Sequence, residues 1–177
     1  MLLIVLLAVL AGSCKKDSST SKTPNNDKDY YIKLKLNGVQ KQYTFNATSL
    51  MPIPTVPTAS TIYTCELTAL LSATNTAWVT VGLTDGAKFA TGKTYTEQLI
   101  TINGTITIQG SFTYKDEDGV IYFASGTTAN TSLKLNFTEV AADHLKGTFS
   151  GTMLKVGSSP LVYVPITEGE FFVGRSL

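Results

Sequence analysis

The stretch Tyr30-Tyr-Ile-Lys-Leu-Lys-Leu36-Asn-Gly38-Val39-Gln-Lys-Gln-Tyr-Thr-Phe45 decides the fold class of this chain. Apolar and polar residues alternate on both sides of Asn37-Gly38, and these two residue types readily adopt the positive φ angles of a two-residue hairpin loop. Such a loop pairs Leu36 with Val39 and, further out, Tyr30 with Phe45. The apolar side chains then share one face, with Lys41 as the exception. The pattern predicts a hairpin half buried in an antiparallel sheet.

The same alternation recurs along the rest of the chain. It covers residues 61–71, 77–83, 100–114, 133–137 and 161–173, with a slip in register near Glu168-Gly169. Short alternating segments with turn residues between them are typical of all-β proteins. We therefore expect an antiparallel β-sandwich of about ten strands over residues 30–177, without substantial helix. A flattened or partly open β-barrel is the alternative.

Two local features bear on the strand register. A tight hairpin at Asn103-Gly104 would mix polar and apolar faces, so this dipeptide is expected to mark a bulge in a long strand from Ile100 to Tyr114. A four-residue loop over residues 116–119 is expected to pair Tyr114 with Ile121.

The first residues have the pattern expected of an export signal. An uninterrupted apolar run from Leu2 to Ala11 is too short to span a bilayer and has the length of the hydrophobic region of a signal peptide. The small residues that follow it lead to Cys14, and Leu10-Ala-Gly-Ser-Cys14 resembles the lipobox of bacterial lipoproteins. The expected organisation is a signal peptide over residues 1–13, a lipidated Cys14 with a polar tether over residues 14–29, and one domain over residues 30–177.

The charge of the chain limits its partners. The formal net charge is +1, and the segment from Tyr30 onward contains ten basic and ten acidic residues. A neutral domain lacks the long-range attraction that nucleic acid requires, so nucleic-acid binding is not expected. Lys15 directly after Cys14 favours the outer membrane, because an aspartate there resembles an inner-membrane retention signal.

Three residues are candidates for a ligand surface. Trp78 is expected to point outward beside Thr80, where it could stack on a sugar. Met51 and Ile53 belong to the proline-rich segment Met51-Pro-Ile-Pro-Thr-Val-Pro57, which reads as a loop or an edge rather than an interior strand. A loop that covers one end of the core is the more ordinary interpretation of this segment.

Residues that could carry chemistry are few and separated. Asp116, Glu117 and Asp118 invite a calcium site, but the run is shorter than a calcium-binding loop and reads first as a turn. His144 is the single histidine and lies beside Asp143, which makes a zinc site or a catalytic triad improbable. Cys65 is expected to be a buried free thiol. We expect no cofactor, no metal and no assembled catalytic site.

The chain resembles an uncharacterised family of small Bacteroidetes-type cell-envelope lipoproteins with a domain of unknown function. The resemblance rests on Leu36-Asn-Gly38, Gly92-Lys-Thr-Tyr95, Asp118-Gly-Val-Ile-Tyr122, Lys146-Gly-Thr-Phe-Ser150 and Ile166-Thr-Glu-Gly-Glu-Phe171. It implies an envelope location and transfers no catalytic residues. The expected function is a non-enzymatic, lipid-anchored binding or accessory module for a glycan or a protein. A small hydrolase using Asp116, Glu117, Asp118 or His144, or a purely structural surface protein, is the alternative.

Overall fold

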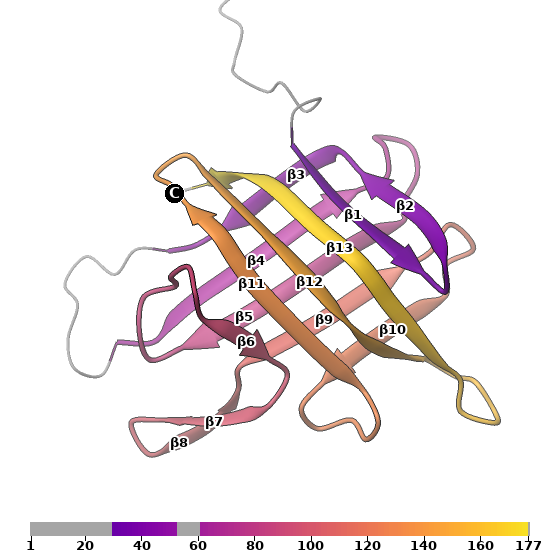
Figure 1. Ribbon diagram of the computed structural model, residues 1–177. Coiled ribbons are helices and arrows are strands. Elements are labelled where there is room, and N and C mark those ends of the chain that lie inside the picture. Colours follow the sequence, from indigo (N-terminus) through magenta and orange to yellow (C-terminus); the bar gives the residue numbers. More distant parts are fainter. Residues whose placement is uncertain (1–29, 53–60, 177) are drawn as a thin grey trace, which may run out of the picture.

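The computed structural model describes residues 30–52 and 61–176, and these form thirteen β-strands and no helix (Figure 1). The strands are β1 (Tyr31–Leu36), β2 (Val39–Tyr43), β3 (Phe45–Leu50), β4 (Tyr63–Leu70), β5 (Trp78–Asp85), β6 (Thr94–Thr96), β7 (Leu99–Ile102), β8 (Thr105–Ile108), β9 (Gly110–Lys115), β10 (Ile121–Ser125), β11 (Ser132–Val140), β12 (His144–Lys155) and β13 (Tyr163–Ser176). The all-β class is confirmed, with somewhat more strands than expected. In the described part of the chain, no helix is long and apolar enough to cross a membrane.

Eleven of the strands form one sheet that folds over itself into two layers. One layer has the order β2-β1-β13-β12-β11-β6 and the other the order β3-β4-β5-β9-β10. Figure 1 shows the strands of the first layer running across those of the second. Nearly all pairings are antiparallel, so the architecture is sandwich-like, as expected, and is not a simple barrel.

The two longest strands, β12 and β13, join the layers because each takes part in both. Most of β13 lies between β1 and β12, but its last residues, Gly174 to Ser176, pair in parallel with β3. Likewise β12 pairs mainly with β11 and β13, whereas Leu154 and Lys155 pair with β10. The expected slip near Glu168-Gly169 is confirmed as a bulge, and Glu168 has a φ of 50° there.

The opening hairpin has the expected register from Leu36–Val39 to Ile32–Tyr43. Its turn residues have positive φ, 48° at Asn37 and 81° at Gly38. The hairpin ends earlier than predicted, however, because the chain leaves β2 after Tyr43 and crosses to the other layer. Phe45 therefore begins β3, a strand that the prediction had not separated, and pairs with Leu70 of β4 instead of Tyr30.

The expected inward rows of β4 and β5 are confirmed. In β4, Cys65, Leu67 and Ala69 are buried, and in β5 every second residue from Val79 is buried. Trp78 and Thr80 lie on the other side of β5 and are partly exposed. The period-two pattern alone was sufficient to predict the inward faces of β4 and β5, because each of these strands lies between two neighbours in the sheet.

The prediction for Asn103-Gly104 was wrong. These residues form a tight hairpin between β7 and β8, with positive φ at both positions and with Ile102 opposite Thr105. The faces do mix, since Ile102 is buried whereas Ile106 is 69% exposed. This is tolerated because β7 and β8 form a separate two-stranded sheet, in which no continuous face has to be buried.

The predicted register between β9 and β10 was wrong by one residue. Tyr114 pairs with Tyr122, and the amide of Asp116 donates to the carbonyl of Val120, so the loop between these two hydrogen-bonded residues is 117–119, one residue shorter than predicted. The Asp116 carboxylate stabilises this loop by accepting hydrogen bonds from the amides of Asp118 (3.0 Å) and Val120 (2.8 Å). Ile121 is consequently on the outside and 40% exposed.

Glycine and phenylalanine face each other twice between β12 and β13. Gly147 pairs with Phe171, and Phe149 pairs with Gly169, so each ring lies over the glycine of the opposite strand. The rings continue inward, where Phe171 contacts Phe137 with centroids 5.7 Å apart and Phe149 contacts Phe112 at 5.5 Å. β12 and β13, the strands that join the layers, therefore place the rings of Phe149 and Phe171 in the core. Its buried residues extend from Ile32 to Val173, so a chain that begins at residue 22 keeps the whole described core.

One buried hydrogen bond in this core gives a testable prediction. Tyr43 and Tyr114 are both fully buried, and the Tyr43 hydroxyl donates to the Tyr114 hydroxyl at 2.9 Å. Tyr43→Phe removes this bond and is expected to lower the free energy of unfolding of residues 22–177 by about 1–2 kcal/mol, measured by urea denaturation. Tyr163→Phe, at a partly exposed position, is the control and should change the free energy of unfolding little. Equal effects of the two substitutions would contradict the role of the bond.

Candidate functional site

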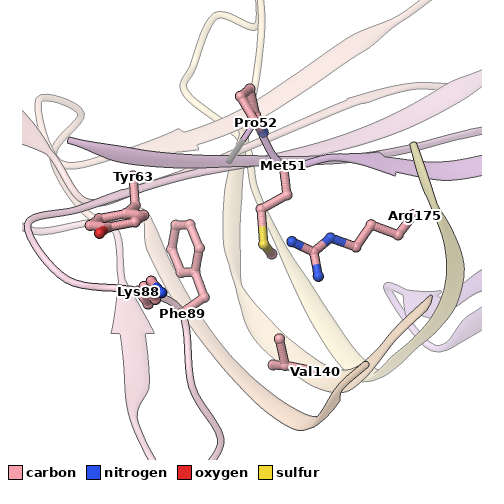
Figure 2. Close-up of a pocket in the computed structure, with 7 residues that line it drawn as sticks. All are labelled: Met51, Pro52, Tyr63, Lys88, Phe89, Val140 and Arg175. Carbon is pink, nitrogen blue, oxygen red and sulfur yellow. The ribbon is translucent and has the colours of Figure 1, made fainter. Parts of the chain in front are cut away.

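A cavity of about 250 Å³ opens at one end of the space between the two layers (Figure 2). We call it the mouth pocket, and it is lined by Met51, Pro52, Tyr63, Lys88, Phe89, Val140 and Arg175. Its surface is mainly apolar, with cationic groups at the side chains of Arg175 and Lys88. An apolar cavity with a few convergent polar groups is the usual form of a small-ligand site.

The mouth pocket lies where the inward-facing rows of several strands end. Beyond the end of β3, Met51 continues the row of buried residues that is formed by Ala47 and Ser49. Tyr63 is the first residue of β4 and begins the inward-facing row that continues with Cys65. Arg175 continues the buried row of Phe171 and Val173 on β13. Because β13 pairs with β3 in parallel at its end, Arg175 and Met51 come to the same edge of the fold.

Arg175 supplies the most distinctive group in the mouth pocket. Figure 2 shows its side chain reaching from the end of β13 toward Met51 and Phe89. One terminal nitrogen, Nη1, donates to the carbonyl of Ala141 at 3.0 Å. The Nε atom is buried and has no hydrogen-bond partner among the described residues. Because Nε has almost no accessible surface, a ligand in the pocket could use only the charge and the other N–H groups of this guanidinium.

The carboxylates around the mouth pocket are already paired with other groups. Asp85, opposite Tyr63 in the sheet, forms an ion pair with Lys93. Glu139, next to Val140, contacts Lys146 at 3.1 Å and His144 at 3.0 Å. Asp143 contacts His144 at 2.8 Å, and this hydrogen bond holds the pKa of the Asp143 carboxyl below its usual value. Within residues 30–52 and 61–176, neither Arg175 nor Lys88 forms an ion pair.

Cys65 lies in the core behind this site. It is a free thiol and 2% exposed, which confirms the expected burial. Burial raises the pKa of the Cys65 thiol to about 12, and the positive charge of Arg175 opposes this rise. The thiol is therefore protonated near neutral pH and is not an activated nucleophile.

The structure separates Met51 and Trp78, two of the three residues predicted to form a ligand surface. Met51 is in the mouth pocket and 7% exposed, whereas Ile53 lies outside the described residues. Trp78 pairs with Leu70 at the far end of β4 from Tyr63, which corresponds to about 23 Å at the usual strand rise. Met51 and Trp78 therefore do not form one site.

The residues considered for chemistry are also apart. Glu117 forms an ion pair with Lys41 at 2.8 Å, and this hydrogen bond lowers the pKa of the Glu117 carboxyl. His144 begins β12, whereas the loop that holds Asp116 and Asp118 adjoins β10, which meets β12 at Leu154 and Lys155. No group of three or more His, Cys, Asp or Glu side chains that could hold a metal ion occurs in the described part of the chain.

Comparisons with protein-family models, with curated proteins and with solved structures found no match to this chain. The functional interpretation therefore rests on the residues themselves.

Sequence reasoning missed most of the mouth pocket, although one signal was present. Arg175 is the single arginine of the chain, and it follows Phe171 and Val173 at the spacing of an inward-facing row. An arginine in such a row has to be satisfied inside the fold or at its end. By contrast, no local pattern distinguishes Tyr63 or Val140, because their place in the pocket depends on how distant strands meet.

Proposed function

We propose that the protein is a lipid-anchored, non-enzymatic binding module of the bacterial cell envelope and that its ligand occupies the mouth pocket. The observation that carries the binding role is the apolar cavity whose lining includes Arg175, a cationic side chain that forms no ion pair in the described residues. The export signal and Cys14, which lies outside the described residues, support the anchor. The neutral charge of the domain agrees with a ligand other than nucleic acid.

The arrangement of the acidic residues supports binding rather than hydrolysis. A glycosidase-type mechanism needs two carboxylates across a cleft, whereas Asp116 stabilises its own loop and Glu117 pairs with Lys41. Neither residue lines the mouth pocket. The tether predicted over residues 14–29 lies outside the described residues; in this proposal it holds the pocket away from the membrane surface, within reach of ligands in the envelope.

The anchor is tested by lipid labelling in a bacterial host. The full chain is expected to incorporate labelled palmitate and to accumulate as an unprocessed precursor when globomycin is added. Cys14→Ala should abolish the label, whereas Cys65→Ala, the matched change at the other cysteine, should leave it intact. Label retained in Cys14→Ala, or absent from the unaltered chain, would refute the anchor.

The binding role is tested with residues 22–177 on a glycan array and against purified envelope proteins. Binding of a glycan or a protein is expected, and it should weaken in a Met51→Ala variant that keeps its folded spectrum. Trp78→Ala changes an aromatic side chain at the other end of β4 and serves as the control. Loss of binding in Trp78→Ala but not in Met51→Ala would place the site elsewhere. Absence of any binding in this experiment and with the small-molecule probes below would favour a purely structural protein.

A further inference from the structure

The charged side chains around the mouth pocket indicate the sign of the charge on its ligand. The neighbouring carboxylates Asp85, Glu139 and Asp143 each contact a basic side chain of their own. Arg175 and Lys88 line the pocket and form no ion pair in the described residues. Among the described residues, the lining of the pocket thus combines two cationic side chains with no carboxylate, and an anion is the complementary ligand.

The form of the Arg175 side chain narrows the choice to an oxyanion. A guanidinium presents its N–H groups as a planar fork that matches the oxygens of a carboxylate or a phosphate. Here the hydrogen bond from Nη1 to the Ala141 carbonyl fixes the orientation of this fork at the pocket.

The other residues that line the pocket are mainly apolar, and they favour a ligand with an apolar body beside its anionic group. Met51, Phe89 and Val140 face the same cavity, and the ring of Phe89 is held by Tyr95 and Phe137, with centroids 5.3 and 5.9 Å away (Figure 2). A cavity of about 250 Å³ has room for a compact group, on the order of eight water molecules in volume. An extended lipid chain would exceed this space.

We propose that the mouth pocket binds a small amphiphilic oxyanion, with its carboxylate or phosphate on Arg175 and a ring-sized apolar body against Met51, Phe89 and Val140. This rests on the proposed function, because it specifies the ligand of the same pocket. Lys88, which is exposed at the pocket, adds a second positive charge near the anionic group.

The test uses residues 22–177 and four small probes. Phenylacetate and phenyl phosphate carry an oxyanion on a ring, phenylacetamide has the ring without the charge, and acetate has the charge without the ring.

Binding is followed by NMR of methionine methyl groups. Met51 lies in the pocket, and the fully buried Met153 lies outside its lining and is the internal reference. Phenylacetate or phenyl phosphate is expected to shift the Met51 signal and leave Met153 unchanged, and to bind at least about tenfold tighter than either partial probe. The stronger of the two identifies the preferred oxyanion.

Arg175→Met removes the charge and keeps an apolar stem. It should weaken the preferred oxyanion at least about tenfold and change phenylacetamide less than about twofold. Lys155→Met also replaces a positive charge with an apolar side chain, but at the last residue of β12, where Lys155 pairs with Tyr122 and lies outside the lining of the pocket. It should leave the affinity for the oxyanion unchanged. Melting curves of both variants check that they remain folded.

Other outcomes separate this inference from the proposed function. If phenylacetamide binds as tightly as phenylacetate, or if Arg175→Met binds the oxyanions normally, the pocket still binds ligands but the oxyanion proposal is wrong. If neither oxyanion binds up to about 10 mM while a glycan or protein binds in the array experiment, the oxyanion proposal also fails and the binding module stands.

Discussion

Gly147→Ala is expected to destabilise the protein by about 3 kcal/mol or more, because a methyl group at this position has no space. Its Cβ atom would overlap both the carbonyl oxygen of Asn136 on β11 and the ring of Phe171 on β13. Neither neighbour can retreat easily. The Asn136 carbonyl belongs to the backbone of a paired strand, and the Phe171 ring is packed against Phe137 inside the core. The substitution therefore disturbs the strands that join the two layers.

The measurement is urea denaturation of residues 22–177 carrying Gly147→Ala, with expression as a soluble protein as a first readout. Gly86→Ala is the matched control, since its Cβ would lie 3.4 Å from the side chain of Ile102, an ordinary contact. The control should change the free energy of unfolding by less than about 1 kcal/mol. A Gly147→Ala variant as stable as the control would show that β11 and β13 can separate without cost, contrary to the packing described above.

Phe137→Ala is expected to lower the free energy of unfolding by about 3–5 kcal/mol, since it leaves a cavity at the centre of an aromatic cluster. Phe137 is 2% exposed, and its ring lies between Phe89, Tyr95 and Phe171, with centroid distances of 5.9, 5.5 and 5.7 Å. The substitution also removes the support behind Phe89, which forms one wall of the mouth pocket. Ligand binding at this pocket should therefore weaken along with the stability.

Phe137→Leu distinguishes cavity formation from a general intolerance of change at this position. Leucine fills more of the space than alanine, so the expected loss is about 1–2 kcal/mol. Both variants are measured by thermal and urea denaturation under the same conditions. If the two substitutions cost the same, the loss does not come from an unfilled cavity, and the account of the aromatic cluster would be incorrect.

The period-two pattern predicted the elements of this fold best in β4 and β5 and in the hairpin of β1 and β2, although β2 lies at an edge of the sheet. The inward rows of β4 and β5 are as expected, and the register of the β1–β2 hairpin is correct up to Tyr43. The alternation is a local property of the backbone, so it can be recognised without knowing the partner strand.

Prediction failed where the outcome depended on the rest of the molecule. The dipeptide Asn-Gly forms a hairpin turn at both of its occurrences, Asn37-Gly38 and Asn103-Gly104. The second was expected to be a bulge, on the assumption that every apolar row faces one core. Because β7 and β8 pair only with each other, that assumption does not apply to them.

By itself, the sequence determined the all-β class and the inward and outward faces of β1, β4, β5 and β11, and it predicts export and lipid attachment at Cys14. The tertiary structure decided which strand ends meet. The parallel contact of β13 with β3 brings Arg175 beside Met51, and the inward rows of β4 and β11 end at the same place in Tyr63 and Val140. The physical reason is that faces follow from local periodicity, whereas a pocket requires long-range pairing between strands that are far apart in the chain.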